Sequence, residues 1–148
     1  MSSLSHNSKP DVIRNHDYLR QVVDFSGLRY GRSHPMDLDG LVEFGGRLFV
    51  FFELKFGAKE VPFGQRLALD HIVDAIHNPQ AGRYAVCFIA QHCSTGDIDA
   101  AKAQVIEYRW NGQWHSPKNA DGTLFHAIDA FGSRYLPDWE RWQNWSPA

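Results

Sequence analysis

The chain has 148 residues with a formal net charge of −2, and 43% of them are hydrophobic. This length and composition are typical of one folded domain and exclude a disordered, collagen-like or low-complexity chain. No apolar run approaches the roughly 18 residues of a membrane span, so we expect neither a membrane segment nor a secretory leader. Cys87 and Cys93 are too few to staple such a domain, which favours a reducing, cytoplasmic location.

The order of predicted elements indicates an α/β fold with a mixed central β-sheet flanked by helices. Residues 1–10 are a polar lead-in, and residues 11–148 form a single domain with an aromatic tail from about residue 136. In chain order, the first predicted elements are a helix over 12–25 and a hairpin of strands 36–44 and 47–56. A helix then follows Pro62 and Gly64, carries Leu69, Ile72, Val73 and Ile76 on one stripe, and ends at Asn78-Pro79. The remaining predicted elements are a buried strand over 84–90, a short helix over 97–103, a hairpin over 105–115 around Asn111-Gly112, and a helix over 124–134.

The tail carries three tryptophans, Trp139, Trp142 and Trp145. Trp139 and Trp142 are three residues apart, so they share a helical face that we expect to pack on the domain core. Anchoring of a dimer and stacking on unpaired bases are the alternatives.

The register of the first hairpin follows from which side chains it must bury. A two-residue loop, Gly45-Gly46, mixes acids with large apolar side chains on both faces, whereas a three-residue loop, Gly45-Gly46-Arg47, separates them. A one-residue slip turns every side chain to the opposite face, so burial selects the longer loop, and glycine suits either loop. The predicted pairs are Phe44 with Leu48, Val42 with Val50, Gly40 with Phe52 and Leu38 with Leu54 on the apolar face, and Asp39 with Glu53 and Asp37 with Lys55 on the other.

This register brings acidic side chains together. Asp39 and Glu53 are predicted to face each other on neighbouring strands, with their Cβ atoms roughly 5 Å apart. Opposed carboxylates repel unless a cation lies between them. Oxygen ligands in a small site suit Mg²⁺ or Mn²⁺, and Lys55, two residues beyond Glu53, can orient the attacking water or neutralise charge on a phosphate.

Asp39-Gly40 and Glu53-Leu54-Lys55, separated by a short hairpin, resemble the PD-(D/E)XK nuclease superfamily. That superfamily includes Holliday-junction resolvases, type II restriction enzymes and many small phage nucleases. The resemblance covers residues 36 to about 76, and it implies a restriction-endonuclease-like core.

The resemblance also implies roles for individual residues. Asp39 and Glu53 would hold Mg²⁺ or Mn²⁺ with the backbone carbonyl of Leu54, and Lys55 would be the catalytic lysine. Gln65 would complete the catalytic set, and its position four residues before Leu69 places it on the helical stripe that faces the sheet.

The identity of the main acidic ligand stays open between Asp37 and Asp39. Pro35 precedes Asp37, whereas Asp39 has no proline directly before it. We interpret Asp37 as a rim residue or a partner of Lys55, and Asp39 as the main ligand.

Four cationic residues surround the predicted site in sequence, namely Arg29, Arg32, Lys59 and Arg66. We expect them to position DNA through phosphate contacts, which carry no sequence information. The resulting hypothesis is a metal-dependent DNA nuclease of phage type that is structure-specific or weakly sequence-specific, and a homodimer if it cuts both strands. No motif for a nucleotide cofactor is present in the sequence. The alternative is a catalytically silent nuclease-fold module with an accessory or anti-restriction role, which binds nucleic acid or a partner protein.

Overall fold

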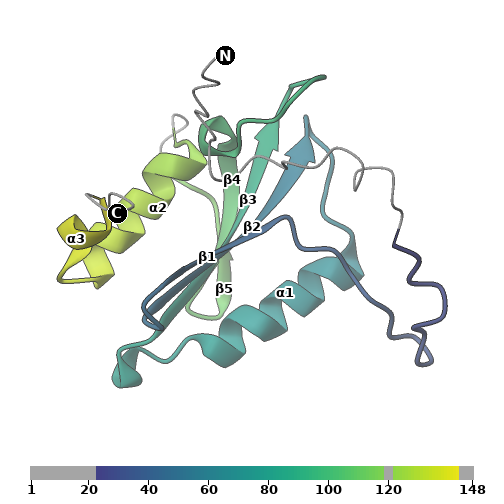
Figure 1. Cartoon of the computed structure of the whole chain (residues 1–148), viewed down its shortest axis with the longest axis horizontal. Coiled ribbons are helices and arrows are strands. Elements are labelled where there is room, and N and C mark those ends of the chain that lie inside the picture. Colours follow the sequence, from purple (N-terminus) through teal and green to yellow (C-terminus); the bar gives the residue numbers. More distant parts are fainter. Residues whose placement is uncertain (1–22, 119–121, 144–148) are drawn as a thin grey trace, which may run out of the picture. The chain divides into compact units, whose positions relative to one another are not determined.

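A computed structural model describes residues 23–118 and 122–143 of the chain (Figure 1). The chain divides into two structural units, residues 1–36 and residues 37–148. Across the described ranges, no helix is both long and apolar enough to cross a membrane.

The first unit contains the start of the predicted domain. The predicted lead-in, residues 1–10, and most of the predicted helix over 12–25 lie outside the described residues. Val23–Phe25, the last three residues of that predicted helix, are described and are not helical, so its predicted end is wrong. The chain already turns there, because the backbone N–H of Ser26 donates to the Asp24 carboxylate over 2.8 Å.

The second unit contains every described helix and strand. The strands are β1 (Gly40–Phe44), β2 (Leu48–Phe56), β3 (Tyr84–His92), β4 (Gln104–Trp110) and β5 (Gln113–His115). The α-helices are α1 (Phe63–Ile76), α2 (Leu124–Tyr135) and α3 (Trp139–Gln143), and two short 3₁₀ turns are η2 (Pro79–Ala81) and η3 (Ala100–Lys102).

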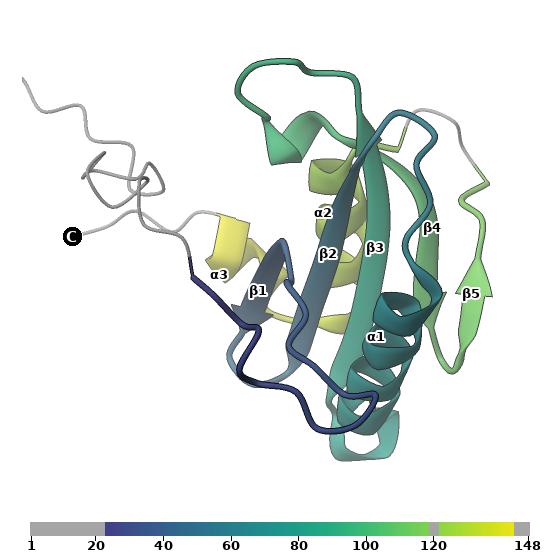
Figure 2. The same cartoon turned by 90° about the vertical axis from the view of Figure 1, so that its right-hand side faces the viewer.

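The five strands form one mixed sheet in the order β1-β2-β3-β4-β5. Strands β2 and β3 are parallel and are connected through α1, whereas every other neighbouring pair is antiparallel. Figure 2 shows α1 on one face of the sheet and α2 on the other. The predicted α/β class, a mixed sheet flanked by helices, is therefore confirmed. The predicted central strand over 84–90 is also confirmed, and it is buried from Ala85 to Ala90.

The β1–β2 hairpin has the predicted three-residue loop. Phe44 pairs with Leu48, and both Gly45 and Gly46 have positive φ, at 59° and 70°, where glycine avoids the strain of a side chain. Further along, Gly40 pairs with Phe52, whose ring occupies the space that a Cβ on Gly40 would need. The apolar face of the hairpin consequently packs into the core on the α2 side of the sheet.

Two details of the predicted helices are wrong. Ile72 is 42% exposed, whereas Leu69 and Val73 are buried, because Ile72 lies about 100° around the helix axis from Val73. A helix was predicted over 97–103, but the structure has only the single 3₁₀ turn η3 in this segment. There the Asp99 carboxylate accepts the N–H of Ala101, which satisfies the local backbone without a longer helix.

The remaining elements follow the sequence prediction closely. The second hairpin turns at Asn111 and Gly112, both with positive φ, as expected for a type I′ turn. Helix α2 begins after Thr123, whose hydroxyl accepts the N–H of His126. In α3, Trp139 is buried, which confirms the predicted core packing for that residue. Trp142 packs against the same core cluster, and Trp145 lies outside the described residues.

Candidate active site

Glu53 is the central residue of the candidate site. It lies on β2, on the face covered by α1, because the hairpin register directs residues 49, 51, 53 and 55 away from the apolar face. Only 3% of Glu53 is exposed, and it is the one buried charged residue in the described part of the chain. A buried carboxylate is costly unless its oxygens are paired, so its contacts are informative.

One oxygen of Glu53 has two partners and the other has none. Oε1 accepts from Nε2 of Gln65 over 2.7 Å and lies 3.2 Å from Nζ of Lys55. Oε2 is buried and has no hydrogen-bond partner among the described residues. An unsatisfied buried acceptor costs about 1–3 kcal/mol. Glu53 therefore has one buried carboxylate oxygen that no described residue uses.

Gln65 connects helix α1 to the strands. It lies in the first turn of α1, and its Nε2 donates both to Glu53 and to the backbone carbonyl of Asp37 over 3.0 Å. This orientation fixes the Glu53 carboxylate and ties the segment before β1 to α1. Asp37 thus contacts Gln65 through its backbone carbonyl, whereas its side chain is exposed.

Asp39 reaches the site in a way that differs from the prediction. The ladder begins at Gly40, so the predicted pairs of Leu38 with Leu54, of Asp39 with Glu53 and of Asp37 with Lys55 are not formed. Instead, Oδ2 of Asp39 accepts the backbone N–H of Leu54 over 2.7 Å. The side chain replaces the backbone carbonyl that would continue the ladder. Its carboxylate is consequently held at the residue that follows Glu53.

These residues fit a hard divalent cation. Within the described ranges, no group of three or more His, Cys, Asp and Glu side chains converges on one point. The site instead offers two carboxylates, Asp39 and Glu53, and the peptide of Leu54 between Glu53 and Lys55. Oxygen-only donors with space for water are the set that Mg²⁺ and Mn²⁺ prefer. The unpartnered Oε2 of Glu53 is the atom that a cation would satisfy.

The four predicted DNA-contacting cations differ in their surroundings. Arg29 and Arg32 belong to the first unit, outside the unit that contains the site. Lys59 is exposed in the connection between β2 and α1. Arg66 forms an ion pair with Glu107 and lies over the ring of Trp114, with its guanidinium carbon 4.4 Å from the ring centroid.

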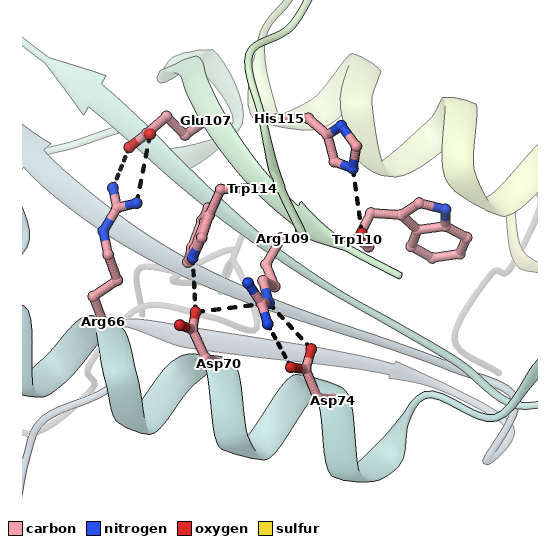
Figure 3. A network of polar contacts seen from close by, with 8 residues as sticks. All are labelled: Arg66, Asp70, Asp74, Glu107, Arg109, Trp110, Trp114 and His115. Carbon is pink, nitrogen blue, oxygen red and sulfur yellow. Dashed lines mark hydrogen bonds and ion pairs between the residues drawn. The ribbon is translucent and has the colours of Figure 1, made fainter. Parts of the chain in front are cut away.

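Arg66 belongs to a polar network that sequence reasoning did not identify. The network joins one flank of α1 to β4 and β5 (Figure 3). Its contacts are Arg66 with Glu107, Asp70 with Nε1 of Trp114 over 2.7 Å, and Arg109 with both Asp70 and Asp74. The i, i+4 spacing of 66, 70 and 74 on α1 indicated one charged stripe, but the partners on β4 and β5 were not identifiable from that spacing.

No protein-family model matches the chain, and comparisons with curated proteins and with solved structures give no match either. The resemblance to PD-(D/E)XK nucleases therefore rests on this chain's own residues.

Proposed function

We propose that the protein is a metal-dependent DNA nuclease of the PD-(D/E)XK type, with a restriction-endonuclease-like core. The observation that carries the proposal is the buried Glu53, whose Oε2 has no partner while Lys55 and Gln65 hold Oε1. A purely structural ion pair would use a buried carboxylate fully. A bound ion is one explanation for a buried carboxylate oxygen that has no partner in the protein.

The order of elements around the site adds support. Asp39 directly precedes an antiparallel hairpin whose second strand carries Glu53, α1 follows, and β3 then lies parallel to β2. The site residues thus come from the open end of the hairpin and the beginning of α1. Residues on such rigid elements keep their geometry when substrate approaches.

Each residue has a role in hydrolysis of a phosphodiester, in which water adds to phosphorus and one P–O bond breaks. Asp39, Glu53 and the Leu54 carbonyl would hold Mg²⁺ or Mn²⁺, which when bound supplies Lewis acidity and an activated water. Lys55 donates hydrogen bonds from its ammonium to the developing charge on the phosphate. Gln65 fixes the Glu53 carboxylate through its 2.7 Å hydrogen bond.

Metal-dependent melting tests the proposal without knowledge of the DNA substrate. Wild type, Glu53→Gln and Glu43→Gln are melted in EDTA and in MnCl₂ or MgCl₂. Glu43 is a matched control because it is an exposed acid of the same hairpin. A ligand at about 100 times its Kd stabilises by about 2.7 kcal/mol, a rise in Tm of roughly 5–10 °C. We expect this rise for wild type and Glu43→Gln and its loss in Glu53→Gln.

A parallel cleavage assay offers flap, branched, single-stranded and linear duplex DNA. Wild type and Glu43→Gln should cut at least one of these with metal, and Glu53→Gln should cut none. Lys55→Ala should lose cleavage while it keeps the metal-dependent rise in Tm. An equal metal response in wild type and Glu53→Gln refutes the site, and metal binding without cleavage of any substrate favours a catalytically silent module.

A further inference from the structure

A cleft of about 520 Å³ opens beside the candidate active site. It lies between the β2–α1 connection, the first turn of α1, and the ends of β3 and β4. The residues that matter for its chemistry are Lys59, Val61, Arg66, Ile89, Gln91 and Ile106. Its volume is within the range of pockets that hold small organic ligands.

The strand register places this cleft next to the site. On β3, Ile89 pairs with Glu53 and Gln91 pairs with Lys55. Paired residues on neighbouring strands share a face, and the strands lie about 4.8 Å apart. The cleft thus begins one strand away from the carboxylate and the ammonium, on the same side of the sheet.

The lining combines an apolar floor with polar groups at its edge. Val61 and Ile89 are buried, and Ile106 is half-buried beside them. The side-chain amide of Gln91 has no hydrogen bond to any described residue, although it is only partly exposed. Arg66 forms one wall and is fixed there by Glu107 and Trp114.

This combination suits a nucleobase. A base offers flat faces that stack on apolar surface and edges that exchange hydrogen bonds with an amide, which is both donor and acceptor. The exposed ammonium of Lys59, which lines the cleft together with its acidic neighbour Glu60, suits the phosphate that a nucleotide carries. Bases stacked and paired inside a duplex cannot enter such a recess, so the occupant has to be unpaired.

We propose that the cleft receives the unpaired base of the nucleotide next to the phosphate that is cut at Glu53 and Lys55. This inference rests on the proposed function and extends it. The substrate then contains single-stranded DNA at the scission point, as in a flap or a frayed end. Gln91 and Ile106 are specificity-determining residues that contact the base.

The test uses the full chain and two variants of the cleft, Gln91→Leu and Ile106→Trp. The first removes the amide and the second fills the space. Gln113→Leu is the matched control, because it makes the same change at an exposed position on β5. The probes are a fluorescent single-stranded dT12 and a 12-base-pair duplex, and binding is followed by anisotropy in EDTA.

Loss of one stacked base weakens binding by about tenfold or more. We expect both cleft variants to lose this affinity for dT12 and to keep wild-type affinity for the duplex, while Gln113→Leu behaves as wild type. Unchanged affinity for dT12 in both variants, or an equal loss for dT12 and duplex, overturns the inference.

A second measurement needs no variant. Thymidine 5′-monophosphate is titrated into wild type and the methyl signals of Ile89 and Ile106 are followed by NMR. Shifts that saturate support the cleft, and the absence of shifts at millimolar nucleotide overturns it. The Mn²⁺-dependent rise in Tm separates the two proposals. A metal response with unchanged dT12 binding in the cleft variants leaves the nuclease proposal standing, whereas cleft-dependent binding without any metal response leaves only a nucleotide-binding site.

Discussion

Substitution of Gly132 by alanine tests how the tail is seated on the fold. Gly132 lies inside α2, and a Cβ at this position would overlap carbon atoms of the Trp139 ring. The ring cannot move freely, because it packs at 5.0 Å against Phe44 and its Nε1 donates to Asp129 over 2.8 Å. An added methyl group at Gly132 must therefore displace packed atoms.

Two effects of opposite sign determine how much Gly132→Ala changes the free energy of unfolding. Helix propensity alone would make alanine more stable than glycine by about 1 kcal/mol. Overpacking of a filled core costs about 1–3 kcal/mol, and displacement of Trp139 adds the loss of its packing with Phe44. We expect a net loss of about 1–2 kcal/mol in the free energy of unfolding.

Gly64→Ala is the matched control for this measurement. Gly64 also lies inside a helix, α1, but nothing lies within 4 Å of the position of its added Cβ. Propensity then acts alone, so we expect a neutral change or a gain of up to about 1 kcal/mol. Urea unfolding followed by far-UV circular dichroism gives both values. A Gly132→Ala variant as stable as wild type would mean that Trp139 does not rest on α2 as described.

Two further predictions concern thiol reactivity and pH. Cys87 is fully buried, and burial, with a smaller contribution from the charge of Glu53, raises its pKa to about 12. We therefore expect an alkylating reagent to modify only the exposed Cys93 in the native protein and both thiols in urea. Rapid modification of Cys87 in the native protein would contradict this expectation. Burial lowers the pKa of His77 below its usual 6.5, so the unfolded chain binds more protons than the folded chain just below that pH. The contribution of His77 to the free energy of unfolding should therefore be constant above pH 6.5 and fall as the pH drops toward the pKa of the folded state. In urea melts at pH 7.5 and 5.5, His77→Asn should lose less stability than wild type, and equal losses would show that His77 is not the group responsible.

Much of the first hairpin could be predicted because one physical rule dominates it. Strict alternation on either side of Gly45 and Gly46 leaves one register in which one face of the hairpin is entirely apolar or glycine, and that register is observed from Gly40 to Phe44. The same rule placed Glu53 and Lys55 on a common face. It did not predict where the β1–β2 ladder ends. The hydrogen bond from the Leu54 N–H to the Asp39 carboxylate is a local side-chain contact, and no repeating sequence pattern indicates it.

The polar network between α1 and strands β4 and β5, and the cleft beside the candidate site, could not be predicted from the sequence. Their geometry depends on how β4 lies against β3, and the register shifts between Ile89 and Ala90. A bulge moves every later residue by one position, so the pairing of Arg66 with Glu107 follows from tertiary structure alone. Arg66 was predicted as a phosphate contact, and the structure shows it in an ion pair with Glu107 that fixes it in the lining of the cleft.

Under the proposed function, the charges of the site explain how an acidic protein acts on DNA. Asp39 and Glu53 contribute −2 and Lys55 contributes +1, so the site without a cation has a charge of −1 and repels a phosphodiester. Under the proposed function, a divalent ion changes this sum to +1, and the site then attracts the phosphate. The proposed function therefore predicts that metal occupancy and affinity for DNA are coupled, with each ligand favouring the other through the same two carboxylates.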